Sequence, residues 1–202
     1  MKDAWFKILV ICIVIYAALN SFIHRAIHHP DGLVLVANDP IQTDTTDSLF
    51  TFKQYIIQPL ADFKIDARVL STEHYYWDTG ADLVPVDLAL GWGRMSDSAV
   101  IKPLHISQSG RFYRYHYDLP APIPPDEIIS HSANMHMIPS TKAIEKVLKN
   151  VRVGQVIHIT GNLVQVTNTE KHWTWRSSLT RYDTGAGACE LVWVKQLSVT
   201  DN

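Results

Sequence analysis

The sequence predicts a mainly β protein of the α+β class, in which an N-terminal transmembrane helix is followed by a small OB-like β-barrel domain with one clear helix. Three observations predict this: an apolar run near the N-terminus, several stretches of alternating apolar and polar residues, and one stretch with apolar residues at helical spacing. We expect residues 1–23 to form a signal anchor, residues 24–49 a tether, and residues 50–202 a single domain.

The apolar run extends from Trp5 to Ile23, and the stretch from Ile8 to Leu19 contains no charge or side-chain amide. A run of this length can span a bilayer core of about 30 Å. The residues that follow offer only poor cleavage sites, which favours an uncleaved anchor; a cleaved signal peptide and a buried helix of a soluble domain are the alternatives. Lys2 and Lys7 precede the charge-free stretch and Arg25 follows the apolar run, which predicts that the N-terminus is cytoplasmic and residues 24 onward are outside.

Composition narrows the possible partners. The net charge is -2 and the basic residues are scattered, so nucleic-acid binding is not expected. Only two cysteines occur, Cys12 within the apolar run and Cys189 near the C-terminus, and they are too differently placed to form an intramolecular disulfide. Cys189 is expected to be a small buried side chain rather than a nucleophile. We expect no cofactor.

The sequence from residue 24 to residue 92 predicts a tether followed by two strands. Residues 24–49 are rich in turn formers around a short apolar run, Leu33 to Val36, and form a tether that can end by adding an edge strand. Alternation from Phe63 to Val69 predicts a half-buried strand that continues to a turn at residues 78–80. Residues 86–92 alternate again, although part of this stretch also tolerates a helix.

The middle of the domain contains a strand and the one clear helix. Residues 112–117 read FYRYHY, which places three tyrosines on one face of a strand. Residues 128–138 are ambiguous. Ser140 is expected to cap a helix whose apolar residues recur at i, i+3, i+4 and i+7, namely Ile144, Val147, Leu148 and Val151.

Three further strands are predicted at residues 155–166, 172–179 and 190–199, with Gly161 as a bulge or bend in the first of them. Four to six strands, one intervening helix and a long strand bent at a glycine describe a small closed barrel, of which the OB-fold is the commonest version. A split mixed sheet with a helix on one face is the alternative.

Three runs resemble segments of bacterial membrane-anchored envelope proteins of uncharacterised activity: VDLALGWGRMSD at residues 86–97, IISHSANMHMIP at 128–139, and RSSLTRYDTGAGACELVWV at 176–194. Together they extend over most of the outer domain. The resemblance implies a bacterial envelope protein and carries over no catalytic residues. Together with the anchor and its flanking charges, it leads us to expect a single-pass inner-membrane protein with a periplasmic C-terminal domain.

The tetrapeptide Asp-Thr-Gly-Ala occurs twice, beginning at Asp78 and at Asp183. Aspartic peptidases need two such aspartates, because two adjacent carboxylates share one proton and act as general base and general acid. DTGAD at residues 78–82 is similar to the retropepsin motif. The residues before each Asp are not the small aliphatic ones of that family, and Asp-x-Gly is also ordinary turn chemistry. A catalytic dyad of Asp78 and Asp183 is therefore the alternative hypothesis.

His131 and His136 are the candidate metal ligands, with Ser132 and Asn134 between them. Five residues apart, the two histidines do not point the same way on a helix or on a strand. The spacing of zinc peptidases is absent. We therefore expect no metal site and a structural role for these histidines.

Aromatic side chains form the leading candidate for a ligand site. The residues are Tyr113, Tyr115, Tyr117, Trp173, Trp175 and the neighbouring Arg176. Flat aromatic surfaces with arginine can stack on sugars or cover a partner protein, although the same rings can instead fill the core. The sequence therefore favours a non-enzymatic binding or assembly module of the envelope, held in the membrane by residues 5–23, with a protein or glycan partner.

Overall fold

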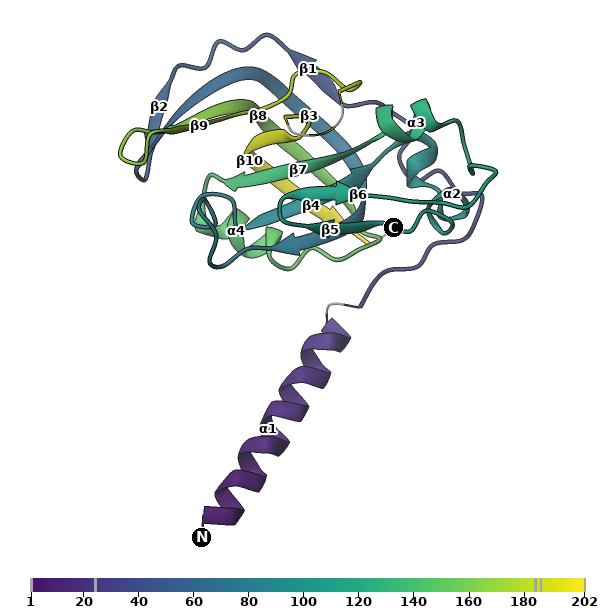
Figure 1. Ribbon diagram of the computed structural model, residues 1–202, viewed down its shortest axis with the longest axis vertical. Coiled ribbons are helices and arrows are strands. Elements are labelled where there is room, and N and C mark those ends of the chain that lie inside the picture. The colour runs from purple at the N-terminus through teal and green to yellow at the C-terminus, as the bar shows by residue number, and fades with distance from the viewer. Residues whose placement is uncertain (1, 24, 184, 186, 202) are drawn as a thin grey trace.

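The computed structural model describes residues 2–23, 25–183, 185 and 187–201, except for the side chains of residues 2–4 and 16–23. A long helix, α1 (Lys2–Ile23), stands apart from the β domain that follows it (Figure 1). The side chains from Trp5 to Ile15 are all exposed. Over the described part of the chain, no helix is both long enough and apolar enough to count as a membrane span. The side chains in the second half of the expected span lie outside the described residues.

Residues 25–49 lie along the β domain. The Ile27 N–H donates to the Val153 carbonyl at 2.8 Å. Gly154, with φ +92°, approaches this segment so closely that a Cβ added to it would lie 2.0 Å from the Ile27 carbonyl oxygen. The segment then forms β1 (Ile41–Thr43), which pairs antiparallel with β3 (Tyr55–His74) at the edge of the sheet. An edge strand thus lies in the later part of residues 24–49, as the sequence predicts.

Five strands of the main sheet pair in a ring. The long strand β3 pairs antiparallel with β8 through its first part and with β4 through its last part. From β4 the pairing passes to β7, then in parallel to β10, and then antiparallel to β8. The other strands of the ring are β4 (Val86–Gly91), β7 (Ser132–Pro139), β8 (Val156–Asn168) and β10 (Glu190–Thr200). The expected mainly β, α+β class is confirmed.

Two short strands extend the ring. The strand β2 (Phe50–Phe52) pairs with the start of β3, and β9 (Trp173–Arg176) pairs with the end of β8. The strand β9 lies within the stretch 172–179, as predicted, but it is shorter. The strand β3 ends at His74, earlier than the turn at residues 78–80 that the sequence predicts.

A glycine on β8 allows a close approach to the paired strand β10. A Cβ added to Gly161 would lie 1.9 Å from the Trp193 carbonyl oxygen. On the opposite strand the register shifts between Val194 and Gln196. The irregularity predicted at Gly161 is present, with the extra residue on β10.

The hairpin formed by β5 (Ser107–Ser109) and β6 (Phe112–Arg114) lies over the outer face of β4 and β7 (Figure 1). The main core fills the inside of the ring. A separate cluster that includes Ala89 and Ile128 lies outside the ring, and Tyr113 packs against it. Because it has core on both faces, β4 is buried along its whole length.

The predicted helix is α4 (Lys142–Leu148), between β7 and β8. Its N-cap is Thr141, whose hydroxyl accepts the Ile144 N–H at 3.2 Å. The predicted cap, Ser140, is wrong, because Thr141 has the extended backbone and the capping side chain of the N-cap position. The Ser140 N–H bonds to the Val194 carbonyl of β10. Three shorter helices add to α4: η1 (Gly93–Ser96), α2 (Ser98–Ile101) and α3 (Pro125–Ser130). The ambiguous stretch 128–138 divides between α3 and β7.

Candidate functional site

The tip of the β5–β6 hairpin places Arg111 against the outer face of the ring. Gly110 and Arg111 are the two central residues of the turn, with φ of +58° and +71°. Positive φ at both positions is the type I′ geometry, which matches the twist of a hairpin. The Arg111 side chain is only 16% exposed, so the turn buries a cation under the hairpin.

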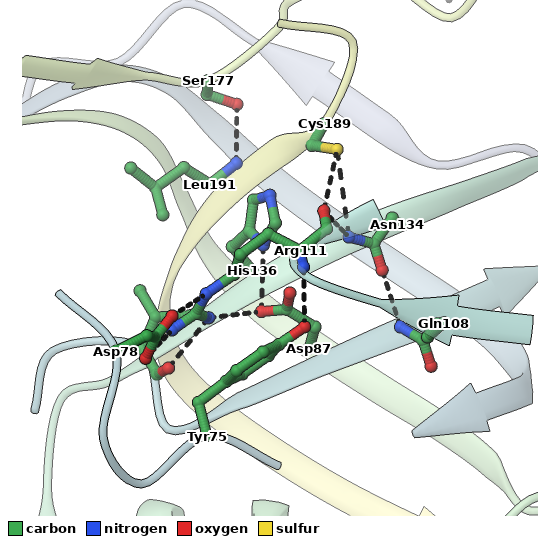
Figure 2. A network of polar contacts seen from close by, with 11 residues as sticks. Tyr75, Asp78, Asp87, Gln108, Arg111, Asn134, His136, Ser177, Cys189 and Leu191 are labelled. Atoms are coloured by element: carbon green, nitrogen blue, oxygen red, sulfur yellow. Dashed lines mark hydrogen bonds and ion pairs between the residues drawn. The ribbon is translucent and has the colours of Figure 1, made fainter. Parts of the chain in front are cut away.

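The Arg111 guanidinium joins two aspartates of different chain segments (Figure 2). Its Nε and Nη2 donate to the Asp78 carboxylate at 2.8 and 3.1 Å, and its Nη1 donates to Asp87 Oδ1 at 2.9 Å. The Asp87 side chain is fully buried on β4. A buried carboxylate needs such a partner, so Arg111 fastens the hairpin to the sheet through charge.

The Tyr75 ring covers the Arg111 guanidinium. The Arg111 guanidinium lies 3.5 Å from the centre of the Tyr75 ring, a cation–π contact. The Tyr75 hydroxyl accepts the Arg111 N–H at 3.0 Å. Burial raises the pKa of Tyr75 above its ordinary value. The phenol therefore stays protonated and acts as a fixed neutral wall of the site.

His136 reaches the same buried aspartate from β7. Its Nδ1 lies 2.9 Å from Asp87 Oδ1, and its ring centre lies 4.5 Å from that of Trp175. His131 has other neighbours: its Nδ1 lies 2.9 Å from Ser130 Oγ. The two histidines are thus in separate surroundings. The described residues bring no three His, Cys, Asp or Glu side chains into an arrangement that could hold a metal ion.

The two aspartates of the repeated motif also have different partners. Both oxygens of Asp78 accept hydrogen bonds from Arg111. Asp183 accepts a 2.6 Å hydrogen bond from the Ser178 hydroxyl. Among the described residues, no hydrogen bond joins the two carboxylates. Thr184 and Ala186 of the second motif lie outside the described residues.

A cavity of about 430 Å³ lies beside this network. Tyr113 and Tyr115 of the hairpin line one side, β7 contributes Asn134, and the segment that precedes β10 contributes Asp183 and Cys189. The Asn134 amide connects the cavity to the network, because its Nδ2 donates to the Arg111 carbonyl at 3.1 Å (Figure 2). The cavity wall is therefore joined to the Arg111 network by a hydrogen bond.

A carboxyl group forms part of the cavity wall. Glu190, at the start of β10, has a side chain only 2% exposed and is paired with Arg181. Its Oε2 is buried without a hydrogen-bond partner among the described residues. Burial raises the pKa of Glu190 to about 7, against the opposing effect of Arg181. The group therefore changes charge near neutral pH.

The cysteine of the cavity is not activated. Burial raises the pKa of Cys189 to about 11, with the Asn134 amide acting in the opposite direction. Its Sγ lies 3.9 Å from Asn134 Nδ2. A thiol with such a pKa is almost entirely protonated at neutral pH, so it is a poor nucleophile.

The predicted aromatic residues divide between two places. Tyr113 and Tyr115 line the cavity, and Trp175 contacts the Arg111 network. Trp173 packs on Tyr55 with ring centres 5.7 Å apart, away from the cavity lining. Arg176 donates to Gln165 on β8 at 2.9 Å and does not line the cavity either.

Sequence reasoning missed Arg111, Asp87 and Glu190. A signal for Arg111 was the Gly-Arg pair between two alternating stretches, which is a two-residue turn. A signal for Glu190 was its position as the single charge in the apolar run ACELVWV. The chain matches no family model, no curated protein and no solved structure.

Proposed function

We propose that this chain is a membrane-tethered, extracytoplasmic binding module of the bacterial envelope, and that its β domain is an OB-like barrel. The observation that carries the proposal is the cavity beside β7, with its volume of about 430 Å³. This volume is within the range of small-molecule sites, which combine apolar or aromatic walls with a few polar groups. Tyr113, Asn134 and Glu190 provide such walls and groups.

The strand order supports an OB-like barrel. In chain order the ring strands are β3, β4, β7, β8 and β10, and the last two exchange places in the sheet, as in a Greek key. OB-folds are five-stranded Greek-key barrels that bind ligands on strands two and three and on the neighbouring loops. Here those strands are β4 and β7, and they carry Asp87, Asn134 and His136.

The exposed helix α1 supports the membrane tether. Its side chains from Trp5 to Ile15 include large apolar groups, and Ile11, for example, is 57% exposed. Apolar side chains exposed along successive turns are stabilised by a lipid phase rather than by water. The basic residues before the apolar run support the N-terminus inside and the domain outside.

Orientation can be tested by labelling with a maleimide that does not cross membranes. Trp77 is 97% exposed, so Trp77→Cys in the full chain should be labelled in intact spheroplasts. Lys2→Cys is the matched control and should be labelled only after lysis. The chain without an added cysteine gives the background from Cys12 and Cys189. Labelling of Lys2→Cys but not of Trp77→Cys in intact spheroplasts would reverse the proposed orientation.

Two observations favour binding over hydrolysis. The raised pKa of Cys189 keeps the cavity thiol protonated. Both oxygens of the Asp78 carboxylate already accept hydrogen bonds from Arg111, and Asp183 bonds to Ser178 instead. The cavity thus provides recognition groups without an activated nucleophile at these positions.

The binding role can be tested with the full chain in detergent micelles. The panel consists of maltotriose, 1,5-diaminopentane, glutarate and trialanine, and binding is followed by chemical-shift changes at Asn134 and Cys189. We expect at least one of these compounds to bind and to lose affinity in Ala188→Phe, which fills the cavity from its lining. Ala121→Phe, a partly buried loop site outside the lining, should bind normally. If no compound affects the cavity, the proposed binding role fails.

A further inference from the structure

Resting on the proposed binding role of the cavity, we infer that its ligand carries a primary ammonium group on an apolar stem. The ammonium group donates to Glu190, and the stem lies against Tyr113 and Tyr115. A diamine and a lysine-type side chain share this chemistry. The inference depends on the charges, the unpaired acceptor and the aromatic rings of the cavity wall.

The charged side chains of the wall differ in how they are engaged. Four charged side chains line the cavity: Arg114, Arg181, Asp183 and Glu190. Arg181 is already paired with Glu190. Asp183 accepts its 2.6 Å hydrogen bond from a neutral hydroxyl, and no ion pair to it is found among the described residues. Arg114 is exposed on β6 and donates to the Ser109 carbonyl. Of the two acids in the lining, Asp183 is therefore the one that a ligand cation can pair with directly.

Glu190 supplies an acceptor that the protein leaves unused. Its Oε2 is buried and makes no hydrogen bond within the described part of the chain, whereas its other oxygen pairs with Arg181. A buried acceptor without a partner is costly, and a ligand donor that reaches it removes this cost. Because a hydrogen bond between two charged groups is stronger than a neutral one, an ammonium group satisfies Oε2 better than a hydroxyl group does.

The aromatic rings suit the rest of such a ligand. Phe112, Tyr113 and Tyr115 line the same cavity. Tyrosine and phenylalanine faces attract cations and also pack against methylene groups. Burial raises the pKa of Tyr113 to about 12, so its ring carries no negative charge at neutral pH. A carboxylate or phosphate group on the ligand has no proton at neutral pH to donate to Glu190 Oε2, so it would leave this acceptor unpaired.

The inference can be tested by titrating the full chain in neutral detergent micelles at pH 8 with four probes. The probes are 1,5-diaminopentane, the Nα-acetyl methylamide of lysine, 1,5-pentanediol and maltotriose. We expect an amine to bind at least about tenfold more tightly than the diol, which has the same stem without the charge. If the diamine binds more tightly than the lysine derivative, the ligand is a free diamine. If the lysine derivative binds more tightly, the ligand is a lysine side chain of a peptide.

Variants show whether Glu190 carries the effect. Glu190→Gln keeps the shape and removes the charge, and it should weaken amine binding about tenfold or more without affecting the diol. Asp183→Asn should weaken amine binding by a smaller factor, and it tests the charge argument if Glu190→Gln fails to fold. Glu170→Gln removes an exposed carboxylate outside the cavity lining and should have no effect.

Two results would overturn the inference while leaving the binding role intact. One is that maltotriose or the diol binds as tightly as the amines, which would indicate a neutral hydroxylated ligand. The other is that amines bind equally well to Glu190→Gln and Asp183→Asn, which would place them elsewhere. If no probe binds and Ala188→Phe changes nothing in the wider panel, both proposals fail.

Discussion

Arg111 reaches Asp87 across the outer face of β4, with 2.9 Å between Nη1 and Oδ1. The aspartate is fully buried, and the arginine comes from a hairpin tip that follows it in the sequence. A buried carboxylate at this position is compatible with folding only if the hairpin closes over it. The contact thus couples the cavity wall to the sheet.

Arg111→Ala should lower the free energy of unfolding by about 3 kcal/mol, because it leaves Asp87 buried without its cation. Urea unfolding of the full chain in micelles measures this loss. Arg114→Ala, on the same hairpin, removes an exposed cation that donates to the Ser109 carbonyl and lies over the Phe112 ring, and it should change stability by less than about 0.5 kcal/mol. Equal effects of the two variants would contradict the proposed role of the buried pair.

Glu190 should make stability depend on pH. Its pKa is raised from 4.5 to about 7, so the folded state holds this proton more tightly than the unfolded state does. The resulting stabilisation is present below pH 4.5 and is lost as pH rises to about 7. Glu190→Gln lacks this loss, and its stability relative to the native chain should rise by up to about 3 kcal/mol over that interval. Arg181, Asp183 and Arg114, the other charges of the cavity lining, are the same in both chains.

Thermal unfolding of both chains from pH 4 to pH 8 measures this difference. The curves should diverge with rising pH, the variant becoming the more stable of the two. Parallel curves would mean that Glu190 has an ordinary pKa in the folded protein.

Gly161→Ala should destabilise the domain by about 2 kcal/mol, since the new methyl group would overlap the Trp193 carbonyl and force β8 and β10 apart. Urea unfolding is again the measurement. Thr160→Ala, at the neighbouring exposed position, should have an effect of about 0.5 kcal/mol or less. If Gly161→Ala left the stability unchanged, the close approach of these paired strands would not be needed for stability.

The two aspartates of the repeated motif should not act as a peptidase dyad. Asp78→Asn should lower stability by about 1 kcal/mol through its half-exposed ion pair with Arg111, whereas Asp183→Asn leaves that pair intact. A peptide mixture incubated with the full chain between pH 3 and pH 6 should remain uncut. Cleavage that disappears in both variants would restore the hydrolase hypothesis.

Much of the β framework could be predicted from sequence. Alternation locates β3, which has one face in the core of the ring and the other face more exposed through its first part. The strands β8 and β10 lie close to the stretches predicted at residues 155–166 and 190–199. The helix α4 is identified by its i, i+3, i+4 and i+7 spacing, although its cap is one residue later than predicted. Ser140 instead bonds through its N–H to the Val194 carbonyl of β10, a contact between distant segments that local pattern does not contain.

The site was less predictable, because contacts between segments distant in the sequence bring its residues together. Asp87 occupies the outward position of an alternating strand and is expected to be solvated, but the hairpin that covers β4 buries it. Arg111 is polar and stands in a turn, where burial is unusual. Tyr113 and Tyr115 were identified as ligand residues from their shared strand face, and they do line the cavity. Glu190 gains its role from Arg181 and the cavity wall, which only the folded chain brings together.

The contact of Ile27 with Val153 limits how far the domain can travel. Only four residue steps separate Ile27 from the end of α1, which allows at most about 14 Å of extended chain. Under the proposed anchoring, this short connection therefore keeps the domain close to the bilayer surface, with the face near Gly154 toward the lipid. A ligand would have to come to the membrane, or already belong to it, because the domain cannot reach out to meet one.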